Sequence, residues 1–233
     1  GNRIYPIGIQ NFEKIRKEGY VYVDKTALMY KLVKSGSYFF LSRPRRFGKS
    51  LLISTLEAYF EAKRDLFEGL AVETLEKDWV KRPVLHLDLN IGKYDTPDSL
   101  DKILNETLDY WESLYGTRSA ETTLALRFAG VVGRAYEQSG ERVAILIDEY
   151  DKPLLQAIGN EELQREFRNT LKPFYGVLKT MDGCIKFALL TGVTKFGKVS
   201  VFSDLNNLND ISMDEPFISI CGITEKEIHL NFE

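Results

Sequence analysis

Apolar runs alternate with segments of helical spacing along most of the 233-residue chain. The apolar-rich runs at residues 38–41, 84–89, 142–147 and 185–190 predict buried strands, and residues 217–220 predict a further one. Apolar positions at helical intervals predict helices over residues 49–60, 96–111, 119–139 and 161–171. Strands that alternate with helices favour an α/β fold, in which helices cover both faces of a parallel sheet of about five strands.

Smaller elements are expected around this pattern. Asn11 can cap a short helix through Arg16, residues 20–23 are β-prone, and residues 27–34 and 74–79 predict helices. The run at 84–89 suits a central strand that is covered on both faces. We therefore expect a lead-in at residues 1–36 that packs on a core at 37–222, and the start of a truncated helical region at 223–233.

The strongest chemical signal follows the first predicted strand, where Gly48, Lys49 and Ser50 open a helix. Backbone N–H groups at a helix start favour an anion, a lysine adds a full charge, and a serine hydroxyl can bind the Mg²⁺ that accompanies a nucleotide. The segment therefore predicts a phosphate-binding loop. Its expected nucleotide contacts are Arg43, Pro44, Arg45, Arg46, Phe47, Gly48, Lys49, Ser50 and Leu51.

This loop departs from the G-x-x-x-x-G-K-[ST] pattern, because Arg43 stands at the first glycine position and Pro44 lacks an N–H donor. A basic loop before an ordinary helix is thus an alternative interpretation. Residues 192–198 also read G-x-x-x-x-G-K, but Val199 replaces the hydroxyl residue and a β-prone run follows. We expect that second loop to flank the nucleotide, where its lysines either reach a phosphate or are solvated.

Two other predicted strands end in polar residues. Asp148 and Glu149 follow a buried run, and these positions suit a carboxylate that holds Mg²⁺ through water and a general base that polarises the attacking water. Thr191 ends the next strand, where its hydroxyl could contact the γ-phosphate or bond to nearby backbone. The alternative for the acidic pair is a helix cap by Asp148 or Asp151.

Other candidate residues are weaker. Arg165 or Arg168 could act as an arginine finger across an oligomer interface, although a solvated helix face is the simpler explanation for both. His86 is expected to be a core residue rather than a ligand.

Composition narrows the class of protein. The chain has 34 acidic and 31 basic residues, a net charge of −3, so no global basic field suggests nucleic acid. No run approaches the roughly 18 apolar residues that span a bilayer, and no signal peptide is visible. Cys184 and Cys221 are far apart in sequence and are expected to be buried free thiols. The sequence therefore predicts a cytoplasmic protein.

Together these motifs resemble the AAA-ATPase-like family of bacterial proteins. The resemblance rests on residues 22–26, 43–50, 67–70, 148–153, 191–196 and 206–211. It implies that Arg43 is a family trait, and that the fold is a P-loop NTPase three-layer sandwich of the additional-strand type. One strand would then lie between the phosphate-loop strand and the acidic strand, a place that residues 84–89 fit. Relatives often carry a C-terminal restriction-type nuclease-like domain, which would lie outside this chain.

The sequence thus predicts Mg²⁺-dependent hydrolysis of ATP to ADP and phosphate, which would drive or gate a C-terminal effector. Lys49, Glu149 and Thr191 are the expected catalytic residues, with Ser50 and Asp148 on the metal. The alternatives are a nucleotide-binding scaffold with little turnover, or nucleic-acid binding through the arginines of the loop. An oligomer is compatible with either.

Overall fold

The computed structural model describes residues 11–44, 48–195, 201, 205 and 208–221. Within these residues, five strands form one sheet in the order β2-β3-β4-β1-β5, and every neighbouring pair is parallel. This confirms the predicted parallel α/β fold. The strands are β1 (Tyr38–Ser42), β2 (Val84–Asp88), β3 (Val143–Asp148), β4 (Ile185–Gly192) and β5 (Asn209–Asp210).

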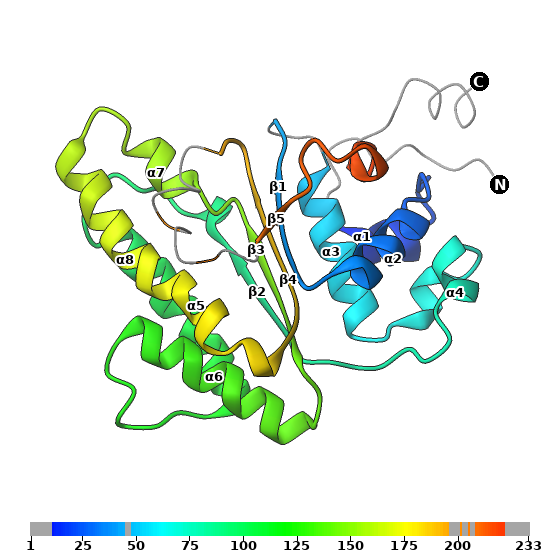
Figure 1. Ribbon diagram of the computed structural model, residues 1–233, viewed down its shortest axis with the longest axis horizontal. Helices are drawn as coiled ribbons and strands as arrows, with labels where there is room; N and C mark the ends of the chain where they lie inside the picture. The colour runs from blue at the N-terminus through cyan, green and yellow to red at the C-terminus, as the bar shows by residue number, and fades with distance from the viewer. Residues whose placement is uncertain (1–10, 45–47, 196–200, 202–204, 206–207, 222–233) are drawn as a thin grey trace.

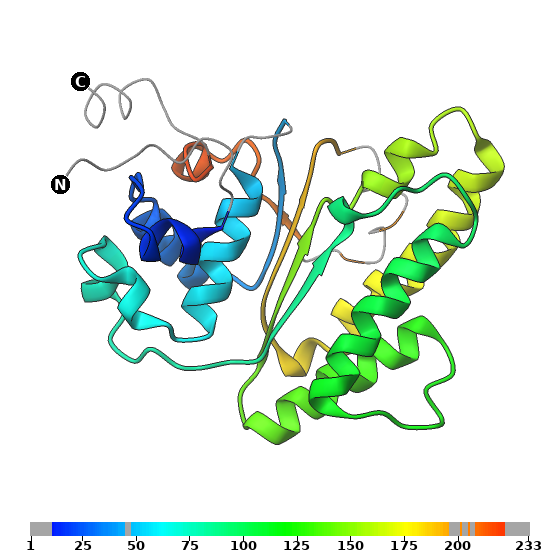
Figure 2. The same ribbon diagram turned by 180° about the vertical axis from the view of Figure 1, so that it is seen from behind.

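Helices cover both faces of the sheet (Figures 1 and 2). One face carries α1 (Phe12–Lys17), α2 (Thr26–Ser35), α3 (Lys49–Phe60) and α4 (Ala71–Leu75). The other face carries α5 (Ser99–Tyr115), α6 (Leu124–Ser139), α7 (Lys152–Gln156) and α8 (Glu161–Thr180). Single 3₁₀ turns lie at Arg64–Phe67, Leu89–Ile91, Asp182–Cys184 and Glu215–Phe217.

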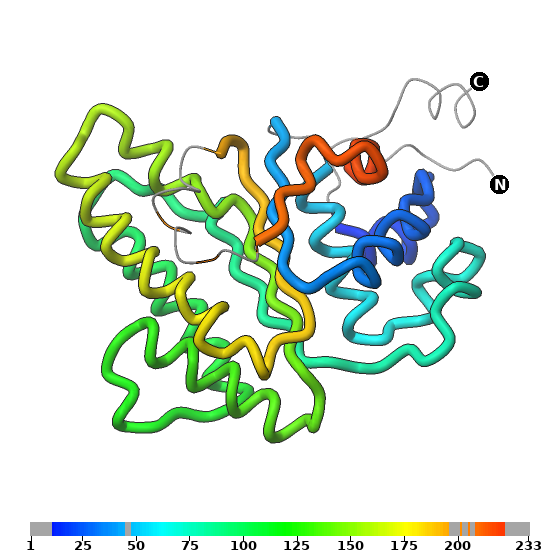
Figure 3. Tube along the Cα trace, in the orientation of Figure 1, coloured from blue at the N-terminus to red at the C-terminus, as the bar shows by residue number. Residues whose placement is uncertain are grey.

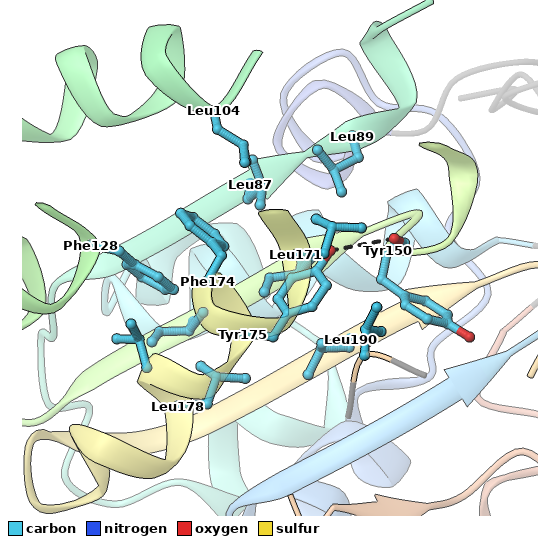
Figure 4. Packing of buried hydrophobic residues seen from close by; sticks show 14 of the residues in the cluster. Leu87, Leu89, Leu104, Phe128, Tyr150, Leu171, Phe174, Tyr175, Leu178 and Leu190 are labelled. Carbon is cyan, nitrogen blue, oxygen red and sulfur yellow. Dashed lines mark hydrogen bonds between the residues drawn. The ribbon is translucent and has the colours of Figure 1, made fainter. Parts of the chain in front are cut away.

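The alternation of side chains along the strands divides the apolar residues into two cores. Leu87 and Leu190 point toward α5–α8, into the cluster that includes Phe174 and Tyr175 of α8 (Figure 4). Leu146 and Leu189 point the other way, into the core under α1–α4. Strands β3 and β4 are therefore buried on both faces, which explains their continuous apolar runs.

The position of β2 corrects one prediction. Residues 84–88 form an edge strand rather than a central one, and their burial alternates along the strand. The strand between β1 and β3 is β4, not β2. The sheet therefore has the expected additional strand, but residues 185–192 supply it.

Two other strand predictions were wrong. Residues 20–23 form no strand, and Tyr22 instead packs edge-on against Phe12 with ring centroids 5.1 Å apart. The apolar residues at 217–220 also form no strand, since a 3₁₀ turn ends at Phe217, and Phe217 and Ile220 are buried in the α1–α4 core. The fifth strand is formed by residues 209–210, which pair with β1.

Two helices, α8 and α4, end at different residues from those predicted. Helix α8 runs from Glu161 through Pro173 to Thr180, beyond the predicted end at residue 171. The extra turns bury Phe174 and Leu178 against the sheet, so packing offsets the hydrogen bond that a proline removes. Helix α4 ends at Leu75, so residues 76–79, predicted as helix, are not helical.

The lead-in packs on the same face of the sheet as α3. Phe12 donates its N–H to Ser54 Oγ at 2.9 Å, and Arg16 Nε donates to the Leu66 carbonyl at 2.7 Å. The predicted helical region at 223–233 lies outside the described residues, and the division at residue 36 stays a prediction. Both cysteines are free, but Cys184 is only half-buried. None of the described helices is both long and apolar enough to cross a bilayer.

Candidate functional site

The start of α3 forms one side of the site. The chain leaves β1 at Ser42, and Gly48 adopts the left-handed conformation (φ 80°) directly before the helix, a conformation that glycine tolerates without strain. Lys49 and Ser50 then supply the first residues of α3, where backbone N–H groups have no intrahelical acceptor. This arrangement can bind an anion at the carboxyl end of the sheet.

Lys49 is buried although it is a lysine, with 3% of its surface exposed. Its Nζ donates to the Arg43 carbonyl at 2.7 Å and the Gly192 carbonyl at 2.9 Å, and it forms an ion pair with Glu149 Oε1 at 2.8 Å. A lysine ammonium has one N–H donor for each of these partners. A phosphate can therefore reach the ammonium only by replacing one of them.

Ser50, Asp148 and Thr191 form a hydrogen-bonded chain. Ser50 Oγ donates to Asp148 Oδ2 at 2.8 Å, and Thr191 Oγ1 donates to Asp148 Oδ1 at 2.7 Å. A serine hydroxyl beside a carboxylate is an oxygen donor set that suits Mg²⁺, which takes its remaining ligands from water and phosphate. No preformed group of three or more His, Cys, Asp or Glu ligands occurs among the described residues. The site therefore fits a Mg²⁺ ion that arrives with a nucleotide.

The Thr191 hydroxyl bonds to nearby backbone, which is one of the two contacts expected for it. Its side chain is fully buried, and besides its bond to Asp148 it accepts the N–H of Glu149 at 3.3 Å. The hydroxyl thus positions the two acids, and its direct contact with the γ-phosphate stays a prediction.

Glu149 is held in an uncommon conformation. Its φ is +58°, in the left-handed region that side chains other than glycine rarely adopt. The next residue, Tyr150, donates its N–H to the Thr191 carbonyl at 2.9 Å, which fixes this turn. Burial raises the pKa of the Glu149 carboxyl, and the Lys49 ammonium offsets that rise only in part. A carboxylate with a raised pKa suits a general base.

Tyr150 and Asp151 hold the segment that follows β4, a role that the sequence did not reveal. The Asp151 carboxylate accepts the N–H groups of Val193 at 3.3 Å and Thr194 at 2.9 Å. The Tyr150 hydroxyl donates to the Thr194 carbonyl at 2.8 Å. A Cβ at Gly192 would lie 2.4 Å from the Tyr150 ring, so only glycine fits there. Asp151 therefore anchors this segment rather than capping α7 through its side chain.

The side chain of Arg43 points to the C-terminal segment. Its guanidinium donates to the Ser212 carbonyl and, at 3.3 Å, to the Ile218 carbonyl. Its backbone N–H donates to Gly192 O at 3.0 Å. The segment from β5 to residue 221, orange to red in Figure 3, returns beside β1 toward the face that carries α1–α4. Arg43 thus ties the end of β1 to that segment.

The structure describes only some of the remaining residues that were predicted to contact the nucleotide. Pro44 is exposed and Leu51 is half-buried, whereas Arg45, Arg46 and Phe47 lie outside the described residues. Their contacts with a nucleotide stay predictions.

The lysines expected to flank the nucleotide and the two arginine-finger candidates belong to separate parts of the structure. Lys195 forms an ion pair with Asp210 at 3.0 Å, and Lys198 lies outside the described residues. Arg165 is exposed and Arg168 half-exposed on α8, on the opposite face of the sheet from α3.

His86 and Asp88 lie on β2 and face α3. His86 is not a core residue, since 30% of its side chain is exposed and its Nδ1 lies 3.6 Å from Glu57 of α3. Asp88 ends β2 in register with Asp148, a position that no local signal in the sequence marks, because the predicted strand runs on to residue 89.

Comparison with known proteins adds to this geometry. A family model described as "Predicted AAA-ATPase" matches residues 6–202. The chain belongs to the AAA-ATPase-like family. This membership supports an ATP-binding, ATPase-like function.

Another protein similar to this AAA-ATPase-like chain comes from Azotobacter chroococcum mcd 1 and is described as an uncharacterized protein in the vnfD 5′ region. The two are 43% identical over 229 residues, which covers 97% of this chain and 44% of the relative. The chain thus spans less than half the length of that relative.

Proposed function

We propose that this chain binds Mg²⁺–ATP at the start of α3 and hydrolyses it to ADP and phosphate. One observation carries the proposal. The start of α3 meets the end of β3 in two contacts. Ser50 donates a hydrogen bond to Asp148 at 2.8 Å, and Lys49 forms an ion pair with Glu149 at 2.8 Å. A charge for the phosphates, an oxygen pair for the metal and a general base thereby share one site.

Each residue then has a defined role. The N–H groups at the start of α3 and the Lys49 ammonium hold the β- and γ-phosphates and neutralise their charge. Ser50 and Asp148 would hold Mg²⁺, which when bound withdraws negative charge from the phosphate oxygens. Glu149 accepts a proton from the water that attacks the γ-phosphorus, and the bond to the bridging oxygen breaks so that this oxygen leaves with ADP. Thr191 holds the Asp148 carboxylate and the backbone of Glu149 in place.

Two assays test this function. Calorimetric titration of the wild-type chain with Mg²⁺–ATP, Mg²⁺–GTP and Mg²⁺–ADP should show binding, and Lys49→Ala should weaken it. Phosphate release should fall by about 10²–10⁴-fold in Glu149→Gln, the usual contribution of a general base. Absence of nucleotide binding by the wild type would refute the proposal. Binding without phosphate release would favour a regulatory scaffold instead.

The wider roles are also proposals. The nucleotide state could gate an effector in sequence outside this chain, since the chain covers 44% of its relative. A nuclease-like domain, a nucleic-acid partner and an oligomer stay predictions that the site itself does not require.

A further inference from the structure

Asp88 has no role in the function proposed above, although it lies at the edge of the site. It pairs in register with Asp148 across parallel strands, whose backbones are roughly 4.8 Å apart. Its neighbours Leu85 and Leu87 point into the α5–α8 core, so alternation directs Asp88 to the α3 face. Asp148 lies on that same face, because its Oδ2 accepts the Ser50 hydroxyl at 2.8 Å. The two carboxyl groups are therefore neighbours beside the start of α3.

The position of Asp88 is fixed by the turn that follows it. Its Oδ1 accepts the N–H of Asn90 at 2.9 Å, and Lys152 of α7 donates to the side-chain oxygen of Asn90 at 3.2 Å. Within the described part of the chain, Oδ2 of Asp88 has no hydrogen-bond donor. This oxygen remains available to a ligand.

The electrostatics of the pair favour a cation. Two carboxylates at this separation repel each other, and a divalent cation near both would relieve the repulsion. Mg²⁺ usually keeps several water ligands and is held by one or two carboxylates together with phosphate oxygens.

We propose that Asp88 is a second carboxylate of the magnesium site, which together with Asp148 holds the water ligands of the ion. Ser50 bonds directly to Asp148, whereas Asp88 is one strand farther from α3, so Asp88 acts through water. The inference rests on the proposed function, because the ion is the one that accompanies the nucleotide. Asp88 is a positioning residue here and touches neither the phosphates nor the attacking water.

The competing explanation is that Asp88 only caps the Leu89–Ile91 turn through its bond to Asn90. Asp88→Asn separates the two roles, since asparagine has the same size and keeps one oxygen acceptor for the N–H of Asn90, but loses the charge and the second oxygen. A cap alone would leave metal binding unchanged in this variant.

The test measures how Mg²⁺ affects binding of a non-hydrolysable ATP analogue to the whole chain. Calorimetry in EDTA and at increasing Mg²⁺ should show that Asp88→Asn needs about tenfold more Mg²⁺ for half of the full effect, the usual cost of losing an outer metal contact. Affinity in EDTA should equal that of the wild type. Asp148→Asn should show a larger shift, and Asp101→Asn, on α5, should behave as wild type. Electron paramagnetic resonance of Mn²⁺ with the same analogue should show the same order of metal affinities.

Each outcome decides something. If Asp88→Asn titrates with Mg²⁺ as the wild type does while Asp148→Asn shifts, Asp88 has no metal role and the proposed function stands. An equal loss of affinity in EDTA and in Mg²⁺ would point to a disturbed turn and would also overturn the inference. If the wild type binds no analogue, both the inference and the proposed function fail.

Discussion

The ion pair between Lys49 and Glu149 makes a prediction that is independent of turnover. Lys49 Nζ uses its donors on Glu149 Oε1 at 2.8 Å and on two carbonyls at 2.7 and 2.9 Å. Nucleotide binding must break one of these contacts before a phosphate can take its place. Glu149 is the partner that a phosphate displaces, because it carries the negative charge that a phosphate can replace. We therefore expect Glu149→Gln to bind nucleotide more tightly than the wild type.

The size of the effect follows from comparing the hydrogen bond that Lys49 donates to Glu149 with the one that it would donate to a glutamine at this position. A hydrogen bond in which one partner is charged contributes about 1.5–3 kcal/mol. The amide oxygen of a glutamine still accepts such a bond from the Lys49 ammonium, but it lacks the attraction between opposite charges. Displacing glutamine therefore costs about 1 kcal/mol less than displacing glutamate, a difference within that range. This difference corresponds to an affinity about fivefold tighter. Loss of the repulsion between Glu149 and the incoming phosphate acts in the same direction.

Calorimetry with ADP and with a non-hydrolysable ATP analogue measures this affinity without interference from hydrolysis. Glu166→Gln, at an exposed position of α8, is the matched control and should bind as the wild type does. An affinity of Glu149→Gln equal to or weaker than that of the wild type would refute the reasoning. The Lys49–Glu149 pair would then not compete with the nucleotide.

Two further predictions concern stability. Arg43→Lys should lower the free energy of unfolding in urea by about 1–2 kcal/mol, because one ammonium cannot replace a planar group that reaches the carbonyls of both Ser212 and Ile218. A urea unfolding midpoint equal to that of the wild type would contradict this anchoring. Burial lowers the pKa of His86, but the carboxylates of Glu57, Asp88 and Asp148 together raise it more, so its folded pKa exceeds the unfolded value. The stability that His86 adds should therefore be present in mild acid and be lost as pH rises through that pKa, and a urea series should show the loss in the wild type but not in His86→Gln.

The residues with chemical roles could be predicted where the signal is local. Gly48, Lys49 and Ser50 are adjacent in sequence, and Asp148 and Glu149 directly follow a buried run, so spacing alone indicates a strand end. The conformation of Glu149 could not be predicted in the same way. It depends on Thr191, which is 42 residues away and is brought alongside only by the sheet.

The order of the strands is also not a local property. An apolar run predicts burial but not which neighbours cover the strand, so β2 was expected in the centre of the sheet and lies at its edge. The same mistake concealed Asp88, which is read as an interruption within an apolar strand unless the edge position and the register with Asp148 are known. The bond from the Arg43 side chain to the Ser212 carbonyl could not be predicted either, because that carbonyl is 169 residues away in sequence.

The charges of the site link nucleotide and metal. Lys49 and Glu149 are an attractive pair that a phosphate must separate, whereas Asp88 and Asp148 are a repulsive pair that a divalent cation stabilises. By linkage, Mg²⁺ must strengthen nucleotide binding by the same factor as the nucleotide strengthens Mg²⁺ binding. Loss of charge at Glu149 acts on the phosphate partner and should raise affinity in EDTA as well as in Mg²⁺. Loss of charge at Asp88 acts on the metal and should reduce only the coupling, so the two variants separate the two halves of the site.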